Sequence, residues 1–89
     1  MTWTYDATKL ETHLNWVRFR IGDTDLSDQQ LSDEEINAIL AAEPRPHFAA
    51  AQAAEAIAAK YTRYGAADEA QAYRNLAEEL RREGGPTYL

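Results

Sequence analysis

The sequence predicts an all-α protein, a small bundle of about four helices in which the last two form an antiparallel helical hairpin. Apolar residues recur at helical spacing in four segments, which are separated by glycine or proline. No window alternates apolar and polar residues in the way of a strand, and valine occurs once. The 89 residues suffice for a single domain, residues 1–89, in which we expect residues 84–89 to form a flexible C-terminal tail.

The first helix is expected from about Ala7 to Arg20, with Asp6 as its N-cap. Its apolar residues recur at i, i+4, i+7 and i+11 and therefore share one stripe: Leu10, Leu14, Val17 and Ile21. Gly22 follows the last of them, at the position where glycine commonly ends a helix.

The second helix has the strongest start signal. Ser32 and Glu35 have the spacing of a capping box, in which each side chain bonds the backbone of the other residue. Leu31 and Ile36 take the two positions of a hydrophobic staple. The helix should end before Pro44, because the residue preceding a proline avoids helical geometry.

The third and fourth helices are expected from about His47 to Tyr64 and from about Ala67 to Arg82. The packed side of the third combines small residues with larger ones: Ala50, Ala53, Ala54, Ile57, Tyr61 and Tyr64. Alanine has the best helix propensity and allows close packing. The stripe of the fourth contains Ala70, Tyr73, Leu76, Ala77 and Leu80. Because the connection is so short, these helices should pair as a hairpin.

Composition argues against several classes of protein. The net charge of −6 opposes non-specific binding to nucleic acid, which requires a surplus of lysine and arginine. There is no cysteine and no run of 18 apolar residues, so we expect neither disulfides nor a membrane span. The N-terminal residues lack the basic and apolar regions of a signal peptide, and we therefore expect a cytoplasmic product.

An acidic segment between the first two helices partly resembles a calcium-binding loop. Numbered from Asp23, it places Asp25 and Ser27 at the third and fifth ligand positions and Glu34 at the twelfth. The sixth position requires glycine for a sharp turn, and here it is Asp28. The favoured interpretation is a solvated acidic loop that ends in a helix cap.

The sequence contains no recognisable catalytic or metal-binding arrangement. His13 and His47 lie on different predicted helices, and a zinc site requires about three protein ligands in one place. Ser27 and Ser32 are assigned to a loop and a cap, and there is no glycine-rich phosphate loop. We therefore expect no enzyme activity, no catalytic or metal-ligating residues and no cofactor.

Aromatic residues are the main candidates for function. Trp16 and Phe19 point away from the apolar stripe of the first helix, so either that helix is buried on two sides or these rings form a protein–protein surface. Tryptophan, tyrosine and arginine are favoured at such surfaces. The segment that follows Gly84 includes Tyr88 and Leu89, whose apolar side chains could become ordered on a partner. The candidate interaction residues are Trp3, Tyr5, Trp16, Arg18, Phe19, Arg20, Tyr88 and Leu89.

Two runs resemble a known family. Residues 16–25, WVRFRIGDTD, followed by residues 31–36, LSDEEI, are similar to a pattern of the head–tail connector (head-completion adaptor) proteins of tailed bacteriophages. Residues 53–61 and 73–81 resemble that family's alanine-rich and closing helices in the same order. The resemblance covers about residues 15–82.

The resemblance implies a structural protein of the virion neck, made in the bacterial host cytoplasm. Such a subunit docks with about eleven others as a cyclic ring on the portal protein. The ring extends the DNA channel without sequence-specific binding and offers a platform for stopper and tail-completion proteins. Family members often have a longer loop between the last two helices, where this chain has only Gly65-Ala66-Ala67. Their C-terminal segment often reaches toward the portal.

Two other classes of function stay open. A free-standing small helical interaction or regulatory protein would bind one soluble target and form no ring. A calcium- or substrate-dependent enzyme would require the acidic loop to be a true site.

Overall fold

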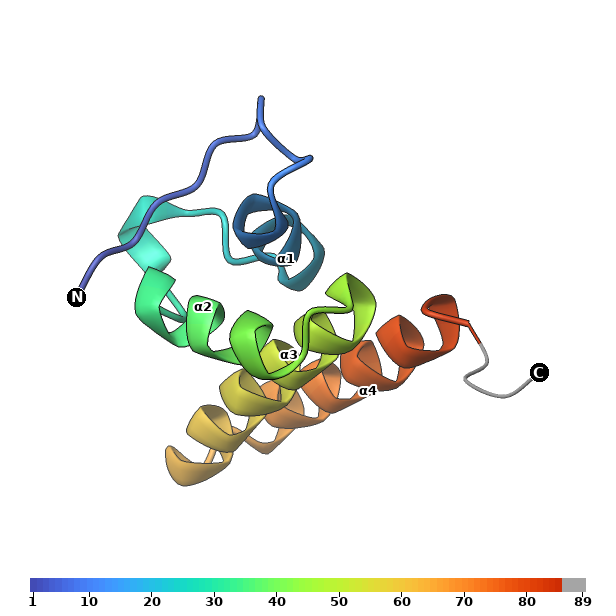
Figure 1. Cartoon of the computed structure of the whole chain (residues 1–89). Coiled ribbons are helices and arrows are strands. Elements are labelled where there is room, and N and C mark those ends of the chain that lie inside the picture. Colours follow the sequence, from blue (N-terminus) through green and yellow to red (C-terminus); the bar gives the residue numbers. More distant parts are fainter. Residues whose placement is uncertain (86–89) are drawn as a thin grey trace.

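The computed structural model describes residues 1–85 and confirms the predicted all-α fold. These residues form four α-helices and one short 3₁₀-helix, and no strand occurs among them. The elements are α1 (His13–Ile21), η1 (Leu26–Asp28), α2 (Asp33–Ala42), α3 (Pro46–Arg63) and α4 (Ala67–Glu83). Figure 1 shows α3 in the centre of the molecule, with α4 along one side and α1 and α2 on the other.

The two longest helices form the predicted antiparallel hairpin. The chain reverses at Gly65, whose φ of 77° lies in the left-handed region that glycine adopts without strain. Near this end of the hairpin the rings of Tyr61 and Tyr73 stack, with centroids 5.7 Å apart and planes 8° from parallel. The hairpin therefore is held along its length by helix packing and at its tip by an aromatic pair.

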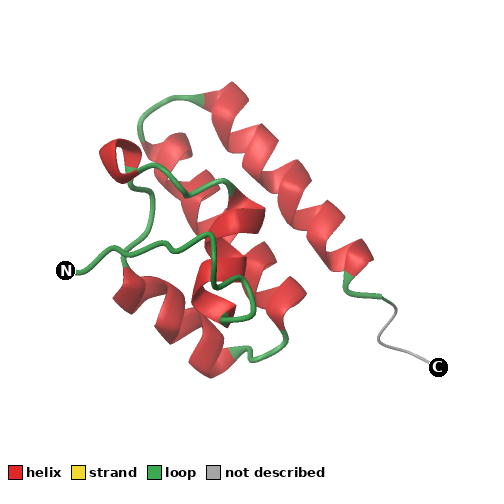
Figure 2. Ribbon diagram, turned by 90° about the horizontal axis from the view of Figure 1, so that it is seen from above, coloured by secondary structure: helices red, strands yellow, loops and turns green. Residues whose placement is uncertain are grey.

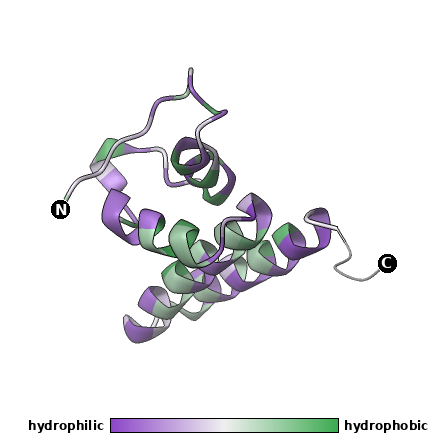
Figure 3. Cartoon of the chain, in the orientation of Figure 1, coloured by the Kyte–Doolittle hydropathy of each residue, from purple (hydrophilic) through white to green (hydrophobic). Residues whose placement is uncertain are grey.

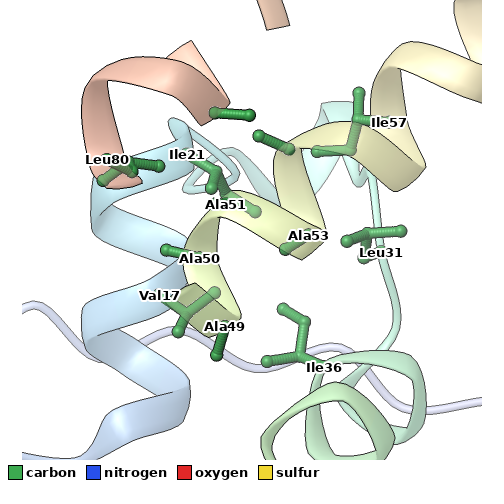
Figure 4. Packing of buried hydrophobic residues seen from close by; sticks show 12 residues of the cluster. Val17, Ile21, Leu31, Ile36, Ala49, Ala50, Ala51, Ala53, Ile57 and Leu80 are labelled. Carbon is green, nitrogen blue, oxygen red and sulfur yellow. The ribbon is translucent and has the colours of Figure 1, made fainter. Parts of the chain in front are cut away.

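Alanines of α3 form the centre of the core. Five of them have no exposed surface: Ala49, Ala50, Ala51, Ala53 and Ala54. Because their side chains are single methyl groups, the neighbouring helices can approach α3 closely. Larger side chains from the surrounding elements and from α3 itself, at Ile57, close the core (Figure 4): Val17, Ile21, Leu31, Ile36, Ile57 and Leu80.

The first helix begins later than predicted, at His13 rather than Ala7. Asp6 does not cap it. Instead, the Asp6 carboxylate accepts hydrogen bonds from the backbone N and the hydroxyl of Thr8, at 2.9 and 2.6 Å, and thereby stabilises a separate turn. The Asp6 backbone N donates to Oδ1 of Asn15 at 2.9 Å. These contacts fold residues 6–12 back toward α1, so residues 7–12 cannot continue the helix.

The predicted start of α2 is confirmed. The Ser32 hydroxyl accepts from the backbone N of Glu35 at 3.1 Å, and the Glu35 carboxylate accepts from the backbone N of Ser32 at 2.8 Å. The two staple residues, Leu31 and Ile36, are buried together in the core. Local signals therefore determine where this helix begins.

Loss of this cap gives a first testable prediction. We expect Ser32→Ala to lower the free energy of unfolding by about 1 kcal/mol, because one helix N–H loses its side-chain acceptor. Urea denaturation measures the change. The matched variant Ser27→Ala, in an exposed turn, should change it by less than about 0.5 kcal/mol. Equal losses in the two variants would contradict the role given to the capping box.

The other helix boundaries agree with prediction to within one residue, and α4 begins at Ala67 as predicted. α3 begins at Pro46 rather than His47, as suits proline at the first helical position. It ends at Arg63, and Tyr64, which was expected on the packed side, is 72% exposed because it lies beyond the last turn. Figure 3 shows apolar residues concentrated where the helices face one another and polar residues along much of α4. Among residues 1–85, no helix combines the length and apolar character needed to cross a membrane.

Candidate protein-interaction surface and the charge network beneath it

Arg18 of α1 is fully buried, between α1, the N-terminal segment and α2. The Arg18 side chain has no exposed surface, and its guanidinium donates four hydrogen bonds. Nη1 binds Oδ2 of Asp23 at 2.5 Å and the carbonyl of Leu31 at 2.8 Å. Nη2 binds Oδ1 of Asp33 at 2.8 Å, and Nε binds the carbonyl of Thr4 at 2.7 Å. Charge-assisted hydrogen bonds of this kind are stronger than neutral ones.

The two carboxylates that face Arg18 are themselves fully engaged. Asp23 is buried and also accepts from the indole Nε1 of Trp3 at 3.1 Å and from the backbone N of Gln30 and Leu31, each at 3.0 Å. Within residues 1–85, no buried polar side-chain atom lacks a hydrogen-bond partner. We call Arg18, Asp23 and Asp33 the charge network. Because every buried charge in it has a partner, its desolvation is compensated.

The charge network holds the first residues of the chain in place. Residues 2–6, the N-terminal strap, run across α1 and the start of α2 (Figure 2). The Thr2 carbonyl accepts from the backbone N of Asp33 at 2.7 Å, and the Asp33 carboxylate accepts from the backbone N and hydroxyl of Thr4 at 2.9 and 2.8 Å. The Trp3 ring lies 4.7 Å from the Arg18 guanidinium. The strap is therefore part of the folded domain.

The network predicts a dependence of stability on acid. Burial alone would raise the pKa of Asp33, but the hydrogen bonds from Arg18 and Thr4 outweigh it and lower the pKa below 3.8. A carboxyl group whose pKa is lower in the folded state than in the unfolded state stabilises the fold at pH values above its unfolded-state pKa. This contribution is lost as the pH falls through the lowered folded-state pKa. The stability difference between the parent and Asp33→Asn should therefore be largest near neutral pH and shrink below pH 3.8.

Urea denaturation at a series of pH values measures this effect. Asp25→Asn is the matched control, because the pKa of Asp25 is also lowered, by hydrogen bonds from Ser27, but its carboxylate is exposed and makes only local contacts. A stability difference for Asp33→Asn that stays constant with pH would exclude the ion pair as its cause.

The structure separates the predicted interaction residues into two groups. Arg18 and Trp3 bind their own chain in the charge network, and Tyr5 is half-buried. Phe19, on the outer side of α1, is 51% exposed. Next to it, Arg20 forms an ion pair with Glu83 of α4, with its Nη2 at 2.7 and 2.8 Å from the two carboxylate oxygens. Phe19 therefore lies on the surface, where a partner could reach it, whereas Arg20 is partly buried.

Trp16 is half-buried, so it belongs neither to the core nor fully to the surface. Its ring packs edge-to-face on His47, with centroids 4.8 Å apart, and the Arg20 guanidinium lies 5.4 Å from the ring centroid. The contacts join α1 to the beginning of α3. Tyr88 and Leu89, the other two predicted interaction residues, lie outside the described residues.

Two exposed apolar side chains were missed by the sequence analysis. Leu26 in η1 is 68% exposed, and Tyr64 at the tip of the hairpin is 72% exposed. For Tyr64 the sequence did contain a signal, because Gly65 breaks the helical pattern and thereby places Tyr64 at the end of the helix. No local pattern distinguishes Leu26 from a loop residue that turns inward.

The residues of the partial calcium-loop pattern each have a partner within the chain. Asp23 binds Arg18, the Asp25 carboxylate caps η1 through Ser27, and Glu34 accepts from the backbone N of Thr2 at 2.9 Å. Among the described residues, no three or more histidine, cysteine, aspartate or glutamate side chains are grouped so that they could hold a metal ion. The acidic loop thus serves as a folding element in this structure.

A hollow of about 300 Å³ lies beside Trp16, where the turn before α1 meets the beginning of α3. It brings together His13 and His47, which the sequence places 34 positions apart. Nε2 of His47 also lies 4.0 Å from a carboxylate oxygen of Glu83. The residues that line the hollow are Leu10, Glu11, His13, Trp16, Pro46 and His47.

Comparison with known protein families, with curated proteins and with solved structures found no match for this chain. The class that the fold defines is therefore a small all-helical bundle.

Proposed function

We propose that this chain is a structural head–tail connector subunit of a tailed bacteriophage or a related particle. In this role it docks as a ring on the portal protein, extends the DNA channel and supports the stopper or tail-completion proteins. The proposal places it in the virion neck and assigns it no reaction, cofactor or metal.

One observation carries the proposal. The two sequence runs that resemble the connector family, residues 16–25 and 31–36, contain all three members of the charge network. Arg18 and Asp23 come from the first run and Asp33 from the second, and they bind one another directly. The resemblance therefore lies in residues that depend on one another physically.

The surface suits assembly through unlike patches. The charge network fixes α1 from beneath, so that Phe19 stands on a rigid helix and can act as an apolar anchor. A ring is built from heterologous interfaces, in which such an anchor meets a different patch of the next subunit. The net charge of −6 would repel the phosphates of DNA that pass through the ring.

The test is association with the portal protein of the same particle. We expect the purified chain to cosediment with portal rings and to add a ring of density in electron micrographs. Phe19→Ala should weaken this association by about ten-fold, since an interface anchor contributes more than about 1 kcal/mol. Tyr64→Ala, which also removes an exposed aromatic ring, should weaken it much less.

Failure of the parent chain to bind the portal at any concentration would reject the connector role. Capture of one soluble partner without a ring would instead favour the alternative, a free-standing helical interaction protein. Phe19 is compatible with that outcome as well, so the portal experiment decides between the two.

A further inference from the structure

The hollow beside Trp16 has the size and the lining to receive one long side chain. Leu10, Pro46 and the indole ring of Trp16 give it an apolar wall. Its volume of about 300 Å³ is at the lower end of the range for ligand pockets. Because the methylene stems of arginine and lysine pack readily on apolar surface, such a wall suits a side chain that carries its charge at the far end.

The polar residues at the hollow favour a cation. Within residues 1–85, Glu11 is exposed and its carboxylate takes part in no ion pair. With neutral histidines, Glu11 is the one charged residue among the described residues that line the hollow. His13 and His47 each add an acceptor nitrogen when their rings are neutral. The lining therefore carries a single negative charge and accepts hydrogen bonds.

Aromatic rings of this chain already contact guanidinium groups within the fold. A guanidinium is planar and more weakly hydrated than an ammonium, so it is attracted to the face of an aromatic ring and stacks on it. Three such pairs occur in the described residues: Arg18 with Trp3, Arg20 with Trp16, and Arg45 with Phe48. Since Arg20 is held by its ion pair with Glu83, it leaves the Glu11 carboxylate to a cation from outside.

We propose that the hollow binds an arginine side chain from a basic segment of another protein. The stem of that arginine packs against Leu10 and Pro46, and its guanidinium pairs with Glu11 and contacts the Trp16 ring. A second copy of this chain is disfavoured as the source, because each copy carries a net charge of −6. The inference goes beyond the proposed connector role and does not depend on it, because its test needs no portal protein.

The experiment titrates the full chain with a short peptide, acetyl-Gly-Arg-Gly-amide, after both tryptophans have been replaced by 5-fluorotryptophan during expression. Trp16 borders the hollow, whereas Trp3 binds Asp23 in the charge network and serves as an internal reference. We expect the ¹⁹F resonance of Trp16 to move until the site is saturated and that of Trp3 to stay in place. The same peptide with citrulline, which keeps the shape but loses the charge, should bind about ten-fold more weakly.

Two charge-removing variants test the site itself. Glu11→Gln should weaken binding of the arginine peptide by about three-fold, as expected for one exposed ion pair. The matched control is Glu69→Gln, which removes an exposed carboxylate from the other end of the hairpin and should leave binding unchanged. Equal effects of the two variants, equal binding of the arginine and citrulline peptides, or a Trp16 resonance that does not move would each overturn the proposal. A Trp16 resonance that shifts with the concentration of the chain alone would assign the hollow to a second copy, and this too would overturn it.

Discussion

Replacing Arg18 with alanine should lower the free energy of unfolding by about 3–5 kcal/mol, because it leaves two aspartates without their buried cation. Asp23 has no exposed surface and cannot recover its hydration without local unfolding. The total stability of a domain is only roughly 5–15 kcal/mol, so this loss is a large share of it. The variant should therefore be largely unfolded at moderate urea concentrations. Urea denaturation followed by circular dichroism measures the loss.

Arg20→Ala is the matched control for this prediction. Arg20 lies two positions away on the same helix, and its ion pair with Glu83 is partly exposed. Such pairs contribute about 0–1 kcal/mol, so Arg20→Ala should remain close to the parent in stability. If both variants lost the same small amount, the charge network would be a minor contributor to the fold, contrary to our interpretation.

A double substitution separates the energy of the ion pair from that of desolvation. Removing both charges in Arg18→Met/Asp23→Leu should cost less than the two single substitutions together, because no unpaired Asp23 carboxylate or Arg18 guanidinium is then left in the core, although Asp33 still loses its partner. Strict additivity of the single effects would show that Arg18 and Asp23 do not stabilise each other.

Ile36→Ala should lower the free energy of unfolding by about 2–5 kcal/mol, the second largest effect that we expect. Ile36 has no exposed surface and fills the space between α2 and the alanines of α3. Because the α3 alanines are already minimal in size, they cannot extend to fill the cavity, and the loss should approach the upper part of the range. Chemical denaturation again provides the measurement.

Ile39→Ala, one turn further along α2, is the corresponding control. Ile39 is only partly buried against the same core, so water can occupy the space that its side chain leaves. Its substitution should therefore destabilise the protein less than that of Ile36. A larger loss for Ile39 would mean that α2 packs through a different face than the structure shows.

The sequence determines the helices most reliably where their ends carry local signals. The start of α2 follows from Ser32 and Glu35, which bond each other's backbone within four residues. The reversal at Gly65 likewise follows from a residue that tolerates the left-handed region. The start of α1 could not be predicted in this way. It depends on Asp6 and Asn15 bonding across a turn and on a strap whose partners lie about thirty positions later.

The same reasoning explains why the burial of Arg18 was missed. Its partners Thr4, Asp23 and Asp33 come from three segments, and no single window of sequence contains them all. One signal was nevertheless present. Position 18 lies four residues after Leu14 and three before Ile21, which places it on the inward stripe of the helix. An arginine at such a position, followed within five residues by an aspartate, indicates a buried ion pair.

The N-terminal strap has a consequence for how the molecule opens. The backbone N of Asp33 bonds the strap at Thr2, and its side chain bonds both Thr4 and Arg18. The first turn of α2 therefore cannot fray while the strap stays bound, and the strap cannot peel away without leaving a carboxylate and a guanidinium short of partners. Residues 2–42 should open together as one cooperative block, whereas the α3–α4 hairpin, which is joined to it by core packing, the Trp16–His47 contact and the partly exposed Arg20–Glu83 ion pair, should form a second block with its own free energy of opening.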